Sequence, residues 1–186
     1  PLPEAGAEPA SVVDTLARAV DPGLVGSAGP RYFGFVIGGS TPAALTADWL
    51  TGTWDQNAAL NLASPAAAAV EAVVADWIKE LLGLPGEAGV GFVTGCQMAN
   101  FTGLLAGRHA VLARAGWDVE EQGLQGAPEI HVAIGEEAHA TILSALRYLG
   151  LGEARAHRVP ADGEGRMIPE ALKATLSPLN GPILVA

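Results

Sequence analysis

Short β-type runs alternate with helical segments from residue 90 onward, and this alternation constrains the fold more than any other feature of the sequence. Strands joined by helices require right-handed crossovers, which place helices on both faces of a parallel sheet. The alternation therefore predicts an α/β fold with a mainly parallel sheet. The four predicted strands are VGFVT (90–94), EIHVAI (129–134), RAHRV (155–159) and PILVA (182–186).

Two helix starts are marked by capping residues. Thr41-Pro42 and Ser64-Pro65 each place a hydroxyl at the N-cap and a proline in the first turn, where its missing N–H is not needed. The helix at residues 65–82 carries apolar residues at three- and four-residue spacing, so we expect this stripe to pack on the sheet. Further helices are predicted at residues 11–20, 97–114, 136–149 and 169–176.

The chain divides by composition into an arm and a domain. Residues 1–30 combine a lead rich in Pro, Gly and Ala with one short helix and a loop, which predicts an N-terminal arm. Residues 31–186 hold the alternating elements of the predicted α/β domain. The run at 182–186 is apolar enough to be buried on both faces of a parallel sheet. Because the chain stops within it, we expect the domain to be incomplete and to continue after Ala186.

The charge and hydropathy of the chain argue against two classes of partner. Twenty acidic residues against ten basic ones give a formal net charge of −10. This charge repels phosphate backbones and anionic lipid, so we expect neither nucleic acid nor a membrane surface as partner. The most apolar stretch, residues 65–82, is interrupted by charged residues and is not a predicted membrane span.

Cysteine usage points to a reducing compartment. The single cysteine, Cys96, has no partner for a disulfide within the chain. No Cys or His residues have zinc-ligand spacing, so no metal site is expected. The amino end lacks a basic segment followed by an apolar one, which argues against a secretory signal. Together these features predict a cytoplasmic protein.

The first candidate site is the turn in VGFVTGCQMANF, where a strand leads through a glycine into a helix. A helix N-terminus presents unpaired N–H groups and a partial positive charge, so the N–H groups of Cys96, Gln97 and Met98 are suited to a phosphate. The turn is neither a GxxxxGK[ST] loop nor a GxGxxG fingerprint. The alternative is an ordinary corner of an α/β domain.

The second candidate is His139, which follows the strand predicted at 129–134. It is expected in the first turn of a helix at the carboxyl edge of the sheet, on the same side as the Gly95 turn. An imidazole there is suited to stacking on a flat cofactor or to proton transfer; the alternative is an ordinary exposed or core histidine. Cys96 with His139 as its base is a further hypothesis, although no third orienting group is evident. The remaining histidines, which are predicted to be structural, are His109, His131 and His157.

Six segments together resemble one known family. From Pro30 to Ala186 the chain resembles the group II pyridoxal-phosphate-dependent decarboxylases, which act on aromatic amino acids, glutamate and histidine. The matching segments follow the family's order at similar spacing. They are PRYFGF, TPAALTADWL, SPAAAAVEAVVADWIKELLG, GFVTGCQMANFTGLLAGR, GEEAHATILSALRYLGLG and VPADGEGRMIPEAL.

The resemblance implies a fold, a cofactor and a set of site residues. The fold is the large domain of fold-type I enzymes that use pyridoxal 5'-phosphate (PLP). The N–H groups of the GCQM turn, at Cys96, Gln97 and Met98, are expected to hold the cofactor phosphate. His139 matches the family's histidine that stacks on the pyridine ring, and is the predicted catalytic residue. The segment containing Phe35 and Gly38 is expected to border the substrate side chain, and family members form homodimers.

Two family residues have no counterpart in this sequence. The family binds PLP as a Schiff base on a lysine that follows a histidine, and pairs the pyridine nitrogen with an aspartate. The two lysines here, Lys79 and Lys173, do not follow a histidine. The remainder of the enzyme after Ala186 is therefore expected to supply both groups.

The resemblance implies decarboxylation of an amino acid, and two alternatives stay open. The same fold and cofactor serve aminotransferases and carbon–carbon lyases, because the phosphate turn and the stacking group do not choose which bond at Cα breaks. A truncated paralogue acting as a non-catalytic scaffold is the other alternative. The scarcity of charge at residues 32–39 favours an apolar or aromatic substrate, whereas Arg31 favours an acidic one.

Overall fold

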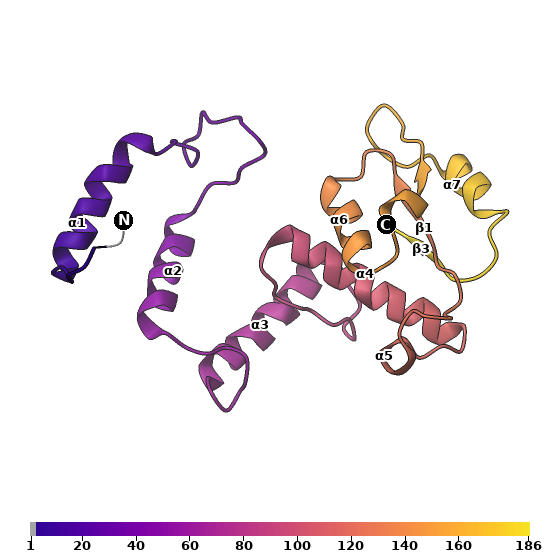
Figure 1. Cartoon of the computed structure of the whole chain (residues 1–186), viewed down its shortest axis with the longest axis horizontal. Helices are drawn as coiled ribbons and strands as arrows, with labels where there is room; N and C mark the ends of the chain where they lie inside the picture. The colour runs from indigo at the N-terminus through magenta and orange to yellow at the C-terminus, as the bar shows by residue number, and fades with distance from the viewer. Residues whose placement is uncertain (1–2) are drawn as a thin grey trace. The chain divides into compact units, whose positions relative to one another are not determined.

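The computed structural model describes residues 3–186, and these form two compact units (Figure 1). One unit ends at Gly86 and the other runs from Glu87 to Ala186. The arm predicted for residues 1–30 is the first part of the first unit, and its boundary stays a prediction. Among the described residues, no helix has the length and apolar content needed to cross a membrane.

The first unit is helical, and the two helices with predicted capping signals begin where those signals predict; the helix predicted at 11–20 begins at Pro9. Thr41 accepts the N–H of Ala44, and Ser64 accepts the N–H of Ala67 at 3.3 Å. Both caps stabilise their helices by satisfying an N–H of the first turn. The helices of this unit are α1 (Pro9–Val20), the 3-10 turn η1 (Asp21–Gly23), α2 (Pro42–Trp54) and α3 (Pro65–Leu82).

The apolar stripe on α3 does not pack on a sheet within its own unit, and its packing on the sheet of the second unit stays a prediction. The first unit contains no strand among its described residues, and most of the stripe is exposed, although Val74 and Ile78 are half-buried. Trp77 is 61% exposed and Leu81 is 83% exposed. The spacing of the stripe predicted the helix correctly, but spacing alone does not name the surface that covers an apolar face.

The second unit is an α/β structure with a parallel sheet. Its strands are joined in the order β2-β1-β3, and both neighbours of β1 run parallel to it. This confirms the parallel sheet expected from the alternation. The elements are α4 (Gly95–Arg114), α5 (Val119–Gln122), β1 (His131–Gly135), α6 (Ala140–Tyr148), η2 (Glu153–Arg155), β2 (His157–Val159), α7 (Pro169–Leu176) and β3 (Ile183–Val185).

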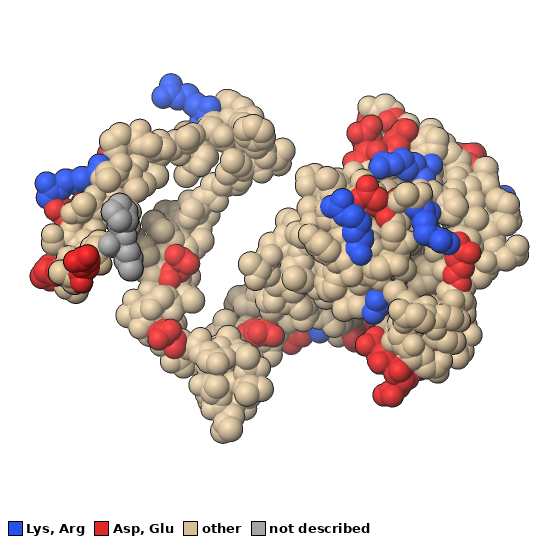
Figure 2. All heavy atoms as spheres, in the orientation of Figure 1, with Lys and Arg blue, Asp and Glu red and all other residues tan. Residues whose placement is uncertain are grey.

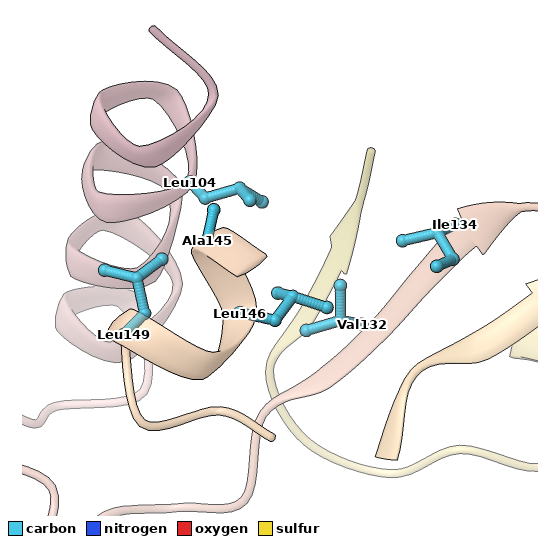
Figure 3. Close-up of a cluster of buried hydrophobic side chains, with 6 residues drawn as sticks. All are labelled: Leu104, Val132, Ile134, Ala145, Leu146 and Leu149. Carbon is cyan, nitrogen blue, oxygen red and sulfur yellow. The ribbon is translucent and has the colours of Figure 1, made fainter. Parts of the chain in front are cut away.

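Helices cover both faces of this sheet. On one face, buried apolar side chains of β1 pack against α4 and α6 (Figure 3). Ala133 and Val159 are fully buried and, because side chains alternate along a strand, belong to the opposite face. Helix α7 contacts β1 and β2 there, and Figure 1 shows α7 and α6 on either side of β1. The first core is formed by Leu104, Val132, Ile134, Ala145, Leu146 and Leu149.

Beyond shifts of one or two residues at other element ends, three predictions for this unit differ from the structure. Residues 90–94 form no strand, because among the described residues no neighbouring strand pairs with their backbone. The helix predicted at 136–149 begins only at Ala140, after a turn that follows β1. Strand β3 lies at an edge of the described sheet and Val185 is 49% exposed, so it is not buried on both faces as expected.

Candidate active site

The start of α4 has the features of an anion site. Gly95 opens the helix with a φ of 76°, which favours glycine. The N-cap residue Thr94 makes no side-chain bond to the first turn, and that turn carries no acidic residue. The N–H groups of Cys96, Gln97 and Met98 therefore lack a side-chain cap at the positive end of a 20-residue helix.

The side chains of this turn play different parts. Cys96 and Met98 are exposed, whereas Gln97 is half-buried and donates its side-chain N–H to the carbonyl oxygen of Thr141 at 3.2 Å. Within residues 3–186 no hydrogen bond joins Cys96 to His139. The hypothesis of a Cys96 nucleophile with a histidine base thus gains no support from the geometry.

His139 is the N-cap of α6, one position before the first turn where it was expected. Its Nδ1 accepts the N–H of Thr141 at 3.2 Å and lies 3.0 Å from Thr141 Oγ1. The imidazole thereby accepts the hydrogen bond that a Ser or Asp side chain usually accepts at an N-cap. The residue is exposed, so one edge of the ring is held by the helix and the rest is accessible.

A side-chain network connects the starts of α4 and α6. Asn100 donates its side-chain N–H to Thr141 Oγ1 at 2.8 Å, and Gln97 reaches the carbonyl of the same threonine. The sequence reading missed Asn100 and Thr141. The spacing could have indicated Asn100, because Gln97 and Asn100 are three residues apart and so share one face of a helix.

The residues of this site fit a phosphate and a flat ring. A Cβ added at Gly95 would meet no atom within 4 Å, so the space beside the turn is open. The donors there are neutral N–H groups without a nearby carboxylate from the first turn, which suits a dianion. His139 offers an exposed planar ring at the carboxyl end of β1, and the network through Thr141 connects it to the turn.

The other histidines and the lysines lie apart from this site. His109 pairs with Glu120 at 3.3 Å, and the rings of His131 and His157 lie 5.6 Å apart on neighbouring strands. Lys79 belongs to the first unit, and Lys173 is exposed on α7, which lies on the other face of the sheet from α4. Among residues 3–186 no group of three or more His, Cys, Asp or Glu could hold a metal ion.

Phe35 and Gly38 belong to the loop of the first unit that precedes α2. Phe35 is 92% exposed and has a φ of 56°, which is uncommon for a bulky residue. Gly38 is exposed in the same loop. These residues and His139 belong to different units, so a shared substrate site stays a prediction.

The second unit is thus a parallel α/β domain that offers an anion-binding helix start and a planar imidazole at the carboxyl edge of its sheet. Residues 2–181 match the family described as "Pyridoxal-dependent decarboxylase conserved domain", and the chain belongs to this family. The family named from the six sequence segments is thereby confirmed.

Curated relatives include decarboxylases of aromatic and of acidic amino acids. The chain is 28% identical over 172 residues to an aromatic-L-amino-acid decarboxylase of Bacillus atrophaeus, covering 92% of this chain and 34% of that protein. It is 29% identical over 160 residues to tryptophan decarboxylase 1 of Oryza sativa, covering 80% and 30%. It is 28% identical over 144 residues to the human acidic amino acid decarboxylase GADL1, covering 77% and 27%. The chain spans about a third of the length of these relatives.

Solved structures confirm the fold. Mouse CSAD superimposes with a TM-score of 0.86 at 25% identity, covering all of this chain and 38% of that one. Oryza sativa TDC with PLP superimposes with a TM-score of 0.79 at 25% identity, covering 96% and 39%. The second unit is therefore part of the fold-type I domain that was expected, and PLP is the cofactor of the family.

Proposed function

We propose that this chain is part of a PLP-dependent enzyme that decarboxylates an amino acid. The observation that supports this most directly is the junction of two helix starts at the carboxyl end of β1. The uncapped first turn of α4 and the N-cap histidine of α6 are joined there through Thr141. Family membership and the decarboxylase relatives support the same reaction.

The first turn of α4 would hold the cofactor phosphate. The N–H groups of Cys96, Gln97 and Met98 would donate to its oxygens, and the positive end of the helix favours the charge. The left-handed backbone at Gly95 aims this turn, and Cys96 and Met98 contribute through their backbone rather than their exposed side chains.

His139 would supply the surface on which the cofactor ring stacks. The bond from Thr141 N–H to Nδ1 fixes one edge of the imidazole, so the orientation of the ring is set before the cofactor binds. Bound at this site, PLP would supply an electron sink for the pair left at Cα by loss of CO₂. His139 would hold the flat cofactor in place and exclude water from the face that it covers.

The covalent anchor would come from the remainder of the enzyme. Lys79 pairs with Asp76 at 2.9 Å and donates to the Gly86 carbonyl at 2.9 Å, and its side chain is only 17% exposed. Lys173 lies on the sheet face away from α4. Neither lysine suits the role, and we propose that the Schiff-base lysine and the aspartate for the pyridine nitrogen follow Ala186.

We propose that the Phe35–Gly38 segment borders the substrate side chain. The positive φ of Phe35 supports this, because backbone outliers of bulky residues concentrate at binding sites. In the full-length enzyme, Phe35→Ala should change the ratio of kcat/KM between an aromatic and an acidic amino acid. An unchanged ratio would remove Phe35 from the pocket.

A homodimer is the proposed assembly, in the cytoplasm. Exposed apolar side chains on α2 and α3 support association, and Figure 2 shows uncharged surface between scattered acidic groups over this part of the first unit. The free, exposed Cys96 is in keeping with a reducing compartment. Sedimentation equilibrium of the full-length protein would separate dimer from monomer.

The function is tested by product analysis of the full-length protein supplied with PLP. Aromatic and acidic amino acids are offered in turn, and both CO₂ and keto acid are measured. Release of CO₂ with the matching amine is expected. A keto acid without CO₂ would indicate an aminotransferase, and absence of both PLP binding and turnover would indicate a non-catalytic scaffold.

A further inference from the structure

The hydroxyl of Thr141 lies between the side chains of Asn100 and His139. Because Asn100 donates to this hydroxyl, the hydroxyl is left to donate to His139. Asn100 Nδ2 is 2.8 Å from Thr141 Oγ1, and Thr141 Oγ1 is 3.0 Å from His139 Nδ1. Asn100 lies in the second turn of α4, His139 is the N-cap of α6, and Thr141 lies in the first turn of α6. Asn100 and Thr141 are half-buried, whereas His139 is exposed.

The direction of each bond follows from the donors available. The amide nitrogen of Asn100 only donates, so Thr141 Oγ1 accepts from it and keeps its own proton for another partner. That partner is His139 Nδ1, which also accepts the backbone N–H of Thr141 at 3.2 Å. Two donors therefore converge on Nδ1, which leaves this nitrogen as an acceptor.

From this arrangement we propose that Asn100 and Thr141 are positioning residues that hold the neutral His139 ring with its proton on Nε2. The inference rests on the proposed function, in which His139 stacks on the cofactor. A histidine's tautomer is set by the bond that its other nitrogen makes. The accessible edge of His139 is thereby a hydrogen-bond donor, and the ring cannot turn over without losing both bonds at Nδ1.

Gln97 also holds Thr141 in place, through the backbone carbonyl of that residue. Its bond to the Thr141 carbonyl holds the first turn of α6 against α4, so the hydroxyl stays within reach of both neighbours. The orientation of the Asn100 amide decides whether the Thr141 hydroxyl donates to His139 Nδ1. An acceptor at that position would draw the hydroxyl proton away from Nδ1, and Asn100→Asp creates such an acceptor in nearly the same shape.

The test measures the tautomer directly in the full-length protein. Histidine is labelled with ¹⁵N, and the His139 ring signals are assigned by their loss in His139→Gln. The neutral ring of the unsubstituted protein should carry its proton on Nε2. Thr141→Val removes one donor and should raise the Nδ1–H fraction about five-fold, and Asn100→Asp should shift it in the same direction.

Two further variants separate positioning from folding. Thr141→Ser keeps the hydroxyl and should restore both the Nε2–H tautomer and kcat. Thr175→Val removes a hydroxyl that bonds the Ala171 carbonyl within α7, and should leave the His139 signals unchanged. Spectra are recorded without PLP as well as with it, because the carboxylate of Asn100→Asp would repel the phosphate.

The outcomes are distinct from those of the function test. A proton on Nδ1 in the unsubstituted protein would overturn the inference, as would an unchanged tautomer in both Thr141→Val and Asn100→Asp. The spectra without PLP report these outcomes whether or not CO₂ is released. If CO₂ is absent but the tautomer responds as expected, the decarboxylase function fails and the hydrogen-bond assignment stands.

Discussion

Gly107 on α4 lies directly against Leu184 on β3, so that a Cβ at Gly107 would be 2.8 Å from Leu184 Cδ2. Real Cβ atoms do not approach another heavy atom so closely, so the missing side chain lets α4 contact the sheet. This close approach fixes the helix whose first turn forms the proposed phosphate site.

Gly107→Ala is expected to destabilise the full-length protein despite the better helix propensity of alanine. The propensity gain is about 1 kcal/mol, whereas a Cβ forces the Leu184 methyl group to move, and because this side chain packs on the core its displacement costs about 1–3 kcal/mol. The net loss should appear as a lower Tm. Gly103→Ala is the matched control, because a Cβ there meets nothing within 4 Å and the variant should gain about 0.5–1 kcal/mol.

A double-mutant cycle checks the cause. Leu184→Ala alone should lose about 2–3 kcal/mol, because it deletes a half-buried side chain that packs on the core. Adding Gly107→Ala to that background should be stabilising. If the two changes in the free energy of unfolding are instead additive, the clash with Leu184 is not what destabilises Gly107→Ala.

The sequence predicted helix starts better than it predicted which elements pair or pack together. The caps at Thr41 and Ser64 and the proline of α7 determine helix starts through contacts a few residues apart, and these starts were correct. Residues 90–94 have strand character, but a strand also needs a neighbour, and local sequence does not supply one. The spacing on α3 likewise predicts an apolar face but not the surface that covers it.

In the candidate site, too, features set by local sequence were predicted and features set by packing between helices were not. The position of His139 follows from strand–helix order, and the structure has it just after β1; Gly95 opens α4 with a positive φ, but the strand expected before it is not formed. Histidine is not a usual N-cap residue, so its bond to Thr141 N–H had no sequence signature. Asn100 joins the site through a residue 41 positions away, and only the packing of α4 on α6 brings them together.

Gly95→Ala should weaken PLP binding about ten-fold in the full-length enzyme. An L-residue at a φ of 76° costs about 1–2 kcal/mol, and relief of this strain turns the N–H groups of the first turn away from the phosphate. Binding is measured by titrating the cofactor-free protein and following the absorbance of bound PLP.

Two controls accompany that measurement. Gly116→Ala imposes the same strain at a φ of 80° beyond the other end of α4, and should leave PLP affinity unchanged. Cys96→Ala should also bind PLP normally, because the proposed contact there is a backbone N–H. A large loss in Cys96→Ala would contradict a backbone-mediated phosphate site.

Acid should loosen the loop around Asp162. Backbone N–H groups of Arg166 and Glu164, together with the Arg166 side chain, hold the pKa of the Asp162 carboxyl below its ordinary value of 3.8. Because the folded pKa lies below the unfolded one, these bonds contribute stability above the unfolded pKa and lose it as the pH falls through the folded pKa.

Hydrogen exchange of the 160–168 segment at a series of acidic pH values measures this change. After correction for intrinsic rates, protection of the Glu164 and Arg166 N–H groups should fall below pH 3.8. Asp162→Asn removes the titrating group, so its protection should be lower at neutral pH and should not change over this range. Equal acid sensitivity in Asp162→Asn would show that another group is responsible.

His139 carries two roles that substitution can separate, because its ring caps α6 and is also the proposed stacking surface. His139→Ala removes both, and should lose about 1 kcal/mol of stability as well as turnover. His139→Asn retains an N-cap acceptor for Thr141 N–H, so its Tm should stay near that of the unsubstituted enzyme. Both variants should lower kcat about 100-fold, because the cofactor ring is no longer held in its reactive position. Normal turnover in a folded His139→Asn variant would assign the residue to the helix cap alone.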